Sequence, residues 1–438
     1  MVLLSGRYWK NEEMKVIVHR GASQIGGCIT EIATDGCKII IDLGTNLPGS
    51  MGDDWQHRDL SPSQVKSLTA DVDAIFYTHY HSDHVGLLHK VPAQVPQYIG
   101  SGAKAVLLDK WSCLHRPDVV KIIEDISTYT AAHRIDVGGK GKIFVTPYWV
   151  SHSAFDSYMF KIECEGKTLL HTGDFRSHGY LGKGLLPLLK KRVGPIDLLI
   201  IEGTMLGRVA ETVVNEREIQ QNTIRMLRDH KYVFALCSST DMERLASFHA
   251  ACRVVGRAFC VDEYQRQILD TFTAYAGDKL SSRLFDFSDA FLLVNFATRR
   301  VRERLQRQGF LMPVRPSHRA LIQAMLHLYD DEPAWLIYSL WQGYAEAGKD
   351  YSNEAVISLR SMFGSCVKEG TCDGFHTSGH ADIDTLRQVC TTLAPRLGII
   401  PIHKESTTRF PEIKGCRIFT ETCQTISLKE ENLTILLQ

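Results

Sequence analysis

The chain carries the sequence DAIFYTHYHSDH at residues 73–84, an apolar run followed at once by three histidines and one aspartate within six positions. Imidazole and carboxylate groups are the ligands that zinc-like divalent ions prefer. A strand end and a tight loop can direct alternate side chains into one pocket, while Asp83 and His84 turn toward a second metal. A histidine-rich surface loop is the alternative, but such loops lack the interleaved aspartate and the preceding buried strand. The stretch therefore predicts a site that can hold two metal ions.

Three further polar residues follow apolar, β-rich runs elsewhere in the chain. They are Asp42 in IIIDLG, His152 in VSHSAFDS and Asp174 in LLHTGDFR. Strand ends that deliver polar side chains to one edge of a sheet commonly build a site there. Either His152 or Asp174 alone is more typical of an ordinary structural residue. Their joint order with residues 79–84 predicts that they converge.

The composition limits the class of protein. The chain has 438 residues, which indicates two domains or one domain with a large insertion. Hydrophobic residues make up 44% and charged residues 23%, as in soluble globular proteins. Lys plus Arg equals Asp plus Glu at 50 each, so no overall basic field attracts nucleic acid. Any affinity for a polyanion must come from a local groove.

Cysteine usage and hydropathy predict a cytoplasmic protein without a membrane segment. The 12 cysteines form no CxxC pair, which favours reduced thiols over a disulfide framework. The N-terminus lacks the features of a signal peptide, and no apolar stretch reaches 18 residues. The first strand is expected to begin at Met14, with residues 1–13 as an appendage.

The chain divides into three segments by pattern. Residues 1–204 are rich in strands, including an expected strand at 105–109, with helices expected around 61–68, 85–91 and 117–130. Residues 205–370 alternate helices with short apolar strands, which is typical of βα units on a parallel sheet. Residues 371–438 return to the first style. The predicted architecture is one α/β layered domain interrupted by an inserted domain, with the site in their cleft.

These motifs resemble those of a known family over nearly the whole chain. HYHSDH resembles the HxHxDH signature of the metallo-β-lactamase superfamily. Glu202 in IIEGT, His380 in HTSGHAD and His403 in IIPIHKE are similar to motifs of its β-CASP branch, which includes ribonuclease J and the endonuclease of mRNA 3′-end processing. The resemblance implies an αββα sandwich interrupted by an inserted β-CASP α/β domain.

The resemblance also implies a ligand set. One Zn²⁺ would be held by His79, His81 and His152. The other would be held by Asp83, His84 and His403. Asp174 would bridge the two ions, and Mn²⁺ or Mg²⁺ could replace zinc. Asp42 would orient the histidine loop by hydrogen bonding.

For the chemistry, the resemblance implies hydrolysis of RNA to 5′-phosphate products by a metal-activated hydroxide, with Asp83 and Asp174 among the catalytic residues. Glu202 would poise His380 as the general acid, because a neighbouring carboxylate raises the pKa of a histidine and orients its ring. A histidine at position 403 accompanies RNA-processing members of the branch. Single-stranded RNA is therefore the expected partner.

The turn at Ser238, Ser239 and Thr240 follows an apolar run and precedes a helix. Thr240 with Glu243 fits a capping box, and a helix N-terminus with hydroxyls can bind a phosphate. A plain cap is the alternative. Together with Ser378 and Gly379 of the SGHA motif, this turn is the predicted phosphate or RNA contact. The arginine-rich stretch 299–307 is expected to be the solvated face of a helix.

Other functions remain open at this stage. A small-molecule hydrolase of the same fold would explain the metal motifs but leaves Glu202, His380 and the middle segment without a purpose. A DNA nuclease is disfavoured by His403. An inactive scaffold would be expected to have lost ligands, and none is missing. The sequence does not distinguish exonuclease from endonuclease action, and a homodimer stays open.

Overall fold

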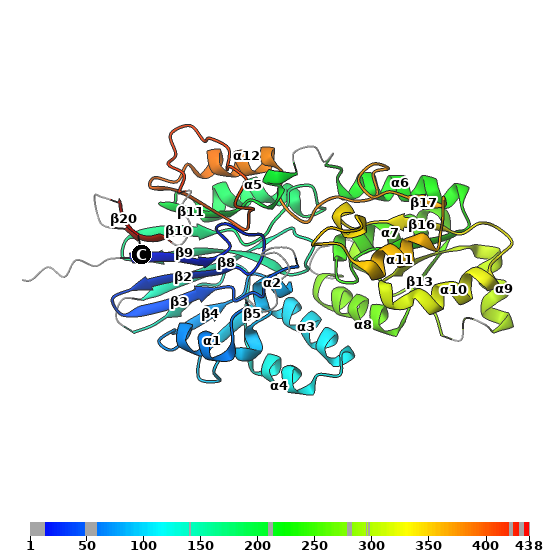
Figure 1. The fold of residues 1–438 in the computed structure, drawn as a ribbon, viewed down its shortest axis with the longest axis horizontal. Helices are drawn as coiled ribbons and strands as arrows, with labels where there is room; N and C mark the ends of the chain where they lie inside the picture. Colours follow the sequence, from blue (N-terminus) through cyan, green and yellow to red (C-terminus); the bar gives the residue numbers. More distant parts are fainter. Residues whose placement is uncertain are drawn as a thin grey trace, which may run out of the picture.

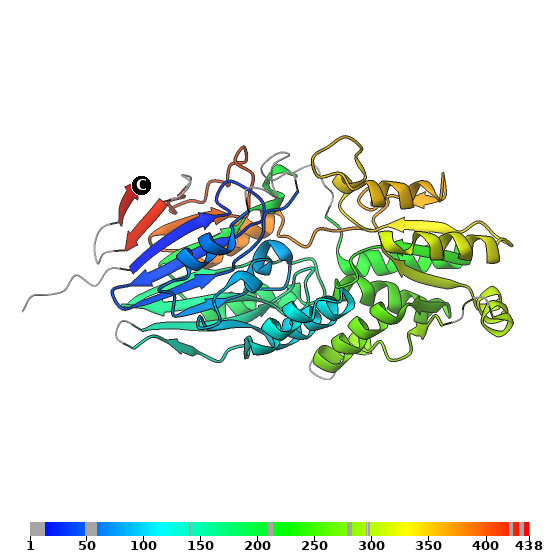
Figure 2. The same cartoon turned by 60° about the horizontal axis from the view of Figure 1, so that its bottom comes forward.

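The computed structural model describes residues 14–48, 59–139, 142–208, 213–277, 283–294, 296 and 298–419, and the backbone of 424–428 and 433–437. The expected appendage at 1–13 lies outside these residues. The chain forms two lobes (Figures 1 and 2). One is a sandwich of two sheets between helices, and the other is a single parallel sheet with helices on its faces.

The sandwich confirms the predicted αββα arrangement. Its first sheet has the order β20-β19-β1-β2-β3-β4-β5-β6, with β1 (Met14–Arg20), β2 (Ile29–Thr34), β3 (Cys37–Ile41), β4 (Ala74–Phe76), β5 (Gln97–Gly100), β6 (Ser127–Tyr129), β19 (Gln424–Leu428) and β20 (Leu433–Leu437). Its second sheet has the order β18-β11-β10-β9-β8-β7, with β7 (Ile135–Val137), β8 (Ile143–Val150), β9 (Ser157–Cys164), β10 (Lys167–His171), β11 (Leu198–Glu202) and β18 (Gly398–Ile402).

The apolar runs in the sequence reflect burial on both faces of these sheets. In β3, Ile39 and Ile41 pack between the two sheets, whereas Ile40 points to the outer helices. In β4, Phe76 likewise faces inward and Ile75 outward. Strands that are buried on both faces show continuous rather than alternating hydrophobicity. The outer layers are α1 (Pro62–Leu68), α3 (Ser101–Cys113) and α4 (Pro117–Asp125) on one side, and α5 (Leu185–Leu188) and α12 (Ile383–Leu393) on the other (Figure 1).

The second lobe lies between β11 and β18 in the sequence. Its sheet has the order β14-β13-β15-β12-β16-β17, with β12 (Tyr232–Leu236), β13 (Ala258–Val261), β14 (Phe291–Leu292), β15 (Phe310–Val314), β16 (Trp335–Tyr338) and β17 (Val367–Lys368), and every described pairing is parallel. Its helices are α6 (Glu216–Asp229), α7 (Met242–Val255), α8 (Glu263–Phe272), α9 (Arg299–Gln308), α10 (Arg319–Leu328) and α11 (Glu354–Ser361). The carboxyl ends of parallel strands share one edge, and this edge faces the sandwich.

Three expected elements differ from the structure. The expected strand at 105–109 is part of helix α3, because a short apolar run does not by itself distinguish a buried helix from a strand. The helix expected at 85–91 is instead the short α2 (Ser82–Val85) followed by a 3₁₀ turn at Leu88–Lys90. The helix expected at 117–130 ends at Asp125, and the chain then enters β6.

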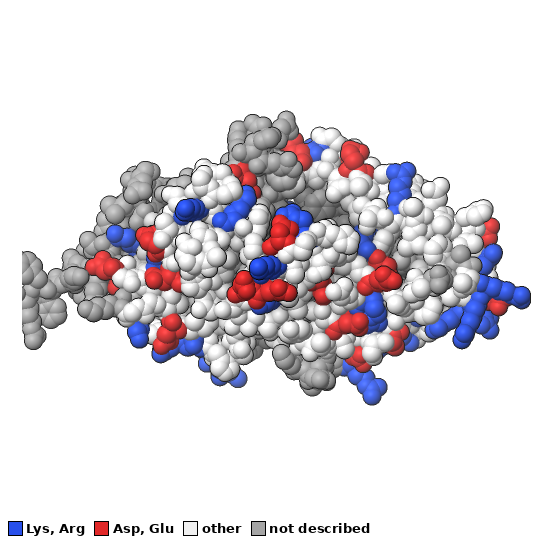
Figure 3. All heavy atoms as spheres, turned by 90° about the horizontal axis from the view of Figure 1, so that it is seen from below, with Lys and Arg blue, Asp and Glu red and all other residues white. Residues whose placement is uncertain are grey.

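The surface carries mixed charge. Figure 3 shows basic and acidic side chains interspersed over one face, with the densest basic group at the end of the molecule that carries α9. The stretch 299–307 is a helix as predicted, and the Arg299 side chain is 91% exposed. Within the described ranges, no helix is long and apolar enough to span a bilayer. The described cysteines form no disulfide.

Candidate active site

The histidine loop leaves the end of β4 and closes into α2. His79, Asp83 and His84 are almost fully buried. The loop is held against residues 43–45 by backbone bonds, because the amides of Leu43 and Thr45 donate to the carbonyls of His84 (2.8 Å) and Ser82 (2.9 Å). A Cβ on Gly44 would lie 1.7 Å from the Asp83 carbonyl oxygen. Only glycine permits this approach, which fixes the loop next to Asp42.

Asp42 orients the histidine loop by hydrogen bonding. Its carboxylate accepts hydrogen bonds from the Thr78 amide (2.7 Å) and from His84 Nδ1 (2.7 Å). Its backbone has a φ of 61°, and the backbone of His403 has a φ of 52°. Left-handed backbone at non-glycine residues is costly and is concentrated at functional sites. Both residues follow strand ends of the sandwich, where the surrounding sheets impose this conformation.

The Asp174 carboxylate lies at the centre of five imidazoles. Its Oδ2 atom is within 4.0 Å of a ring nitrogen of each of five residues: His79 (4.0 Å), His84 (3.2 Å), His152 (4.0 Å), His380 (3.6 Å) and His403 (3.6 Å). His81 joins through His152, whose Nε2 is 3.3 Å from His81 Nδ1. Asp83 Oδ2 is 3.1 Å from His403 Nε2. The structure thus brings all seven predicted metal ligands together.

The donor atoms suit a metal. His152 Nδ1 lies 2.6 Å from the Gly379 carbonyl, which can only accept, so this nitrogen carries the proton and Nε2 keeps its lone pair. His84 is oriented in the same way by Asp42. His79 Nε2 and His84 Nε2 are buried and make no hydrogen bond. An orphaned lone pair beside a carboxylate is what a divalent cation would satisfy.

The protonation states agree with this fit. Burial lowers the pKa of His81 to about 4 and holds the pKa values of His79 and His152 well below the ordinary range. These imidazoles are therefore neutral at physiological pH, which is the form that binds metals. Burial alone would raise the pKa of Asp174, but His403 and His84 lower it well below its usual value. The centre therefore offers the neutral imidazoles of His79, His81 and His152 beside an ionised carboxylate. Burial would lower the pKa of His84 as well, but the carboxylates of Asp174 and Asp42 outweigh it and raise that pKa, so His84 must release a proton to bind a metal.

His380 stands at the rim of this centre. Its Nδ1 lies 3.0 Å from Glu202 Oε2, and its side chain remains 19% exposed. Burial would lower the pKa of His380, but the carboxylates of Glu202 and Asp174 outweigh it and raise that pKa. Glu202 is fully buried and also accepts from the Phe175 amide at 3.0 Å. The pair therefore couples a fixed carboxylate to a histidine that reaches solvent.

A cleft of about 520 Å³ lies between the lobes and opens over this centre. The five predicted phosphate contacts line it: Ser238, Ser239, Thr240, Ser378 and Gly379. They share it with His81, Asp83, His380 and His403. Residues more than 100 positions apart in the sequence therefore meet in one cavity beside the metal ligands.

The cap of α7 differs from the prediction. Asp241, not Thr240, is the N-cap, and its side chain accepts from the Arg244 amide at 3.2 Å. Thr240 lies one residue before this N-cap, and its hydroxyl hydrogen-bonds the Ser238 hydroxyl at 3.2 Å. Glu243 is not the second half of a capping box, because its carboxylate is taken up by Arg176 and Ser151. The sequence pattern missed these partners since they come from the other lobe.

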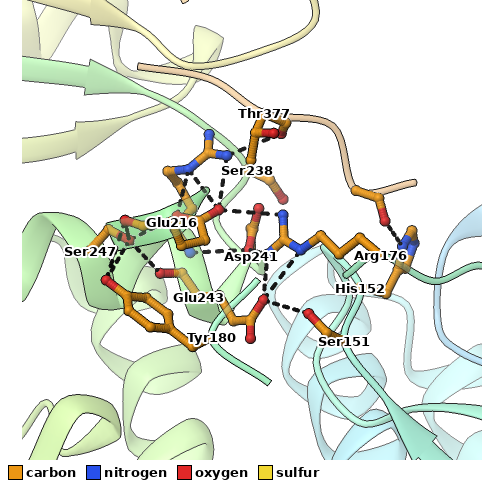
Figure 4. Close-up of polar contacts among 12 residues, drawn as sticks. Ser151, His152, Arg176, Tyr180, Glu216, Ser238, Asp241, Glu243, Ser247 and Thr377 are labelled. Carbon is orange, nitrogen blue, oxygen red and sulfur yellow. Dashed lines mark hydrogen bonds and ion pairs between the residues drawn. The ribbon is translucent and has the colours of Figure 1, made fainter. Parts of the chain in front are cut away.

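A buried ionic cluster of Arg176, Glu216, Asp241, Glu243 and Arg244 joins the lobes (Figure 4). Arg176, just after Asp174, donates to Glu243 Oε2 (2.7 Å) and reaches Glu216 Oε1 (3.3 Å). Arg244 donates to the same Glu216 oxygen at 3.0 Å. All five side chains are nearly inaccessible to solvent. Charges buried to this degree are tolerated only when they are paired, so the cluster depends on every member.

The cluster also holds the loops of the site. Ser151, beside the ligand His152, donates to Glu243 Oε2 at 2.8 Å. Arg244 Nη2 donates to the Thr377 carbonyl (3.1 Å), and Arg176 Nη1 donates to the Ser378 carbonyl (3.4 Å). The segment that carries His380 is therefore tied to both lobes at once.

Three carboxylates face two guanidinium groups in this cluster, and the pKa values of Asp241 and Glu216 shift in opposite directions. Burial raises the pKa of Asp241 to about 6, with Arg176 opposing this shift and Glu216 adding to it. Glu216 itself is held by Arg244 and Arg176, which outweigh burial and lower its pKa from 4.5 to about 2. The lowered pKa of Glu216 makes the stability of the protein depend on pH. A carboxyl whose pKa is depressed by folding contributes stability above its unfolded pKa, and this is lost as the pH falls from about 4.5 toward 2.

We expect Glu216→Gln to reduce the loss of unfolding free energy that occurs as the pH falls below about 4.5. In urea titrations of metal-free protein between pH 6 and 2.5, the free energy of unfolding of the parent should fall more steeply below pH 4.5 than that of the variant. Asp136→Asn, which removes an exposed carboxylate paired with Arg134, is the matched control and should keep the parent's slope. Parallel curves for Glu216→Gln and the parent would contradict the assignment.

Several residues at the site were not predicted from the sequence. Cys28 is buried within ligand distance of His84 and His403, although it lies in no histidine motif. His376 lines the cleft and its Nδ1 is 3.4 Å from Arg244. His178 hydrogen-bonds the Ser378 carbonyl at 2.6 Å. Cys28 and His178 reach the site only in the folded chain, whereas His376 begins the HTSGHAD motif, and its place four residues before His380 could have identified it.

Comparisons with known proteins agree with this geometry. Residues 38–230 match a beta-lactamase superfamily domain. Ribonuclease J of Mycobacterium tuberculosis (strain H37Rv) is 26% identical over 259 residues, which cover 56% of this chain and 43% of that protein. Ribonuclease J of Helicobacter pylori (strain 26695) is 26% identical over 170 residues, covering 37% and 23%. The chain thus matches less than half the length of these relatives.

A solved structure extends the likeness of the fold to the whole chain. The crystal structure of a protein of unknown function from Enterococcus faecalis V583 superposes with a TM-score of 0.68 and covers 97% of this chain and 100% of that one. At 16% identity this similarity concerns the fold alone. With the sandwich, the histidine loop and these comparisons taken together, the chain contains a beta-lactamase superfamily domain over residues 38–230 and resembles ribonuclease J over about half its length.

Proposed function

We propose that this protein is a zinc-dependent ribonuclease that hydrolyses phosphodiester bonds of single-stranded RNA and leaves 5′-phosphate products. The observation that carries the proposal is the set of four imidazoles within 4.0 Å of Asp174, beside a His380–Glu202 pair in an open cleft. The similarity to ribonuclease J supports RNA as the substrate. The proposed compartment is the cytoplasm.

The proposed domain boundaries are those that the resemblance to the β-CASP branch implies. Residues 1–204 and 371–438 would form the metallo-β-lactamase domain, and residues 205–370 the inserted β-CASP domain. The parallel sheet between β11 and β18 supports this division. The cleft then lies between the domains, a common position for a ligand site.

Each residue has a proposed role in the reaction. His79, His81 and His152 would hold one Zn²⁺, Asp83, His84 and His403 the other, and Asp174 would contact both. When bound, such ions lower the pKa of water and stabilise charge on a phosphoryl oxygen. Hydrolysis breaks the bond between phosphorus and O3′, so the phosphate stays on the downstream 5′ oxygen. His380 would donate a proton to the departing O3′, and Glu202 would hold its ring in position.

Cleavage of matched 5′-labelled RNA and DNA strands by zinc-loaded protein tests the proposal. We expect RNA to be cut, the activity to disappear with a chelator and to return with zinc, and Asp174→Asn to lose both metal and activity. The ladder of products separates exonuclease from endonuclease action. Protein that binds two equivalents of zinc but cuts neither strand would reject the nuclease proposal, and faster cutting of DNA would reject the RNA preference.

A further inference from the structure

The edge of the parallel sheet sets the order of side chains along the cleft. Strands β13, β15, β12 and β16 are neighbours in that order. The residues that follow them and line the cleft are, in the same order, Tyr264, Arg315, the turn 238–240 and the segment 339–344. Because all four strands are parallel, these residues form a row from one end of the cleft to the other.

The two ends of this row differ in chemistry. At the β13 end, Lys110 of α3 shares the cleft with Arg315, and α3 is tied to α8 by the bond from Gln267 to Asp109 (2.6 Å). At the β16 end the cleft is lined by Trp341 and Tyr344. Tyr344 is 40% exposed, the aromatic member of the small set of exposed large apolar side chains in the described part of the chain. An exposed aromatic ring in a cleft that also contains charged side chains is a candidate contact for a ligand.

The backbone holds this aromatic end rigidly. The Tyr338 hydroxyl donates to the Trp341 carbonyl (2.8 Å), and the Asn353 amide donates to the Tyr344 carbonyl (3.0 Å). Both aromatic residues lie in or beside the 3₁₀ turn Gln342–Ala345, where Gly343 packs directly on the Trp341 ring. The turn therefore presents its rings without a rearrangement on binding.

Of the two rings, only that of Tyr344 offers open surface to a ligand. The Arg208 guanidinium covers a face of Trp341 at 4.1 Å, and Tyr351 packs on it at 4.8 Å. Tyr344 meets Trp341 edge-on, with centroids 5.4 Å apart and planes at 85°. Nothing in the described ranges hydrogen-bonds the Tyr344 hydroxyl. The Tyr344 ring thus packs against Trp341 and keeps part of its surface exposed.

This ring lies near the proposed metal ligands. It lines the same cleft as His81, Asp83 and His403. A Cβ on Gly26 would meet both the Leu47 side chain and Asp83, so Leu47 also borders this end of the cleft. The aromatic and aliphatic side chains at this end of the cleft suit a nucleobase better than a phosphate.

We propose that Tyr344, braced by Trp341 and Arg208, is a stacking subsite for one unpaired base of the substrate strand. The inference rests on the proposed function, since it takes a polynucleotide as the ligand. Aromatic side chains bind bases of single strands by stacking, and a base in a duplex has no free face to offer. The subsite therefore selects single strands and tolerates any base, whereas the cationic end of the cleft contacts the backbone.

Binding of a fluorescein-labelled 12-nucleotide RNA strand to metal-free protein in a chelator tests the subsite without cleavage. At one fixed salt concentration we expect Tyr344→Leu to weaken binding about 5- to 100-fold, because stacking on an aromatic ring contributes that much per base. Tyr344→Phe should bind like the parent. An abasic strand of equal length should bind the parent more weakly and be unaffected by either substitution. Val254→Ser, at an exposed apolar site on the outer side of α7, is the control and should change nothing.

The outcomes separate this inference from the proposed function. Unchanged affinity in Tyr344→Leu, or an equal loss on the abasic strand, overturns the subsite even when the protein cuts RNA. The expected pattern in a protein that cuts nothing supports the subsite and leaves the nuclease proposal to fail by itself. Absence of binding to any strand overturns the subsite together with its polynucleotide ligand.

Discussion

Replacing His380 by alanine is expected to slow RNA cleavage by a factor of about 100 to 10,000 while leaving the zinc content at two equivalents. The factor is the usual contribution of a general acid. The ring approaches Asp174 at 3.6 Å and is oriented by Glu202 at 3.0 Å, which supports its proposed role in proton transfer. Single-turnover rates and metal analysis by mass spectrometry measure the two quantities.

The leaving group provides a sharper version of this test. In a substrate with sulfur in place of O3′ at one linkage, the thiolate departs without a proton, so His380→Ala should cut it at a rate close to that of the parent. His133→Ala, at an exposed position in the loop after β6, is the matched control and should behave as the parent on both substrates. A zinc content that drops in His380→Ala would instead make His380 a ligand, and an equal deficit on both substrates would reject its role as the acid.

Replacing Arg176 by methionine is expected to lower the free energy of unfolding by about 3–5 kcal/mol, the usual cost of removing one partner from a buried ionic cluster. Methionine fills the space of the arginine stem, so the loss reports the charge and its hydrogen bonds. Glu243, Asp241 and Glu216 would then face Arg244 alone. Because Glu243 also holds Ser151 beside His152, we expect cleavage to fall as well.

Urea unfolding at pH 7 measures the stability of this variant, and Arg253→Met, on α7, is its control. Arg253 pairs with Asp289 at the surface, where its side chain is 32% exposed, so its loss should cost less than about 1 kcal/mol. Arg176→Lys keeps the charge without the planar fork and should fall between the parent and Arg176→Met. A change within 1 kcal/mol for Arg176→Met would show that the cluster does not hold the lobes together.

Some of the site could be predicted because its information is local. The histidine loop is a run of six residues after an apolar strand, and each of Asp42, His152, Asp174, Glu202 and His403 sits at the end of an apolar run. Strand ends converge in a layered α/β fold, so joint order was enough to predict proximity. The motif resemblance then named their roles, which remain to be tested.

Local patterns failed wherever the deciding partner was distant. The run at 105–109 is a helix because its apolar face packs on the sandwich, and its composition alone suited a strand equally well. Thr240 and Glu243 match a capping box in the sequence, but the Glu243 carboxylate binds Arg176 of the other lobe. Cys28 reaches the ligands only because the loop after β1 folds over them.

By itself, therefore, the sequence determined the layered α/β fold with its insertion and the histidine loop, since both follow from short-range patterns of hydrophobicity and residue type. The full set of seven proposed metal ligands came from the resemblance of the motifs to a known family. The tertiary structure alone decided the buried cluster around Arg176 and the aromatic end of the cleft at Tyr344. Both depend on residues from separate segments that meet only after the inserted lobe has docked on the sandwich. Pairing energies of this kind arise from burial and distance, which a linear pattern does not record.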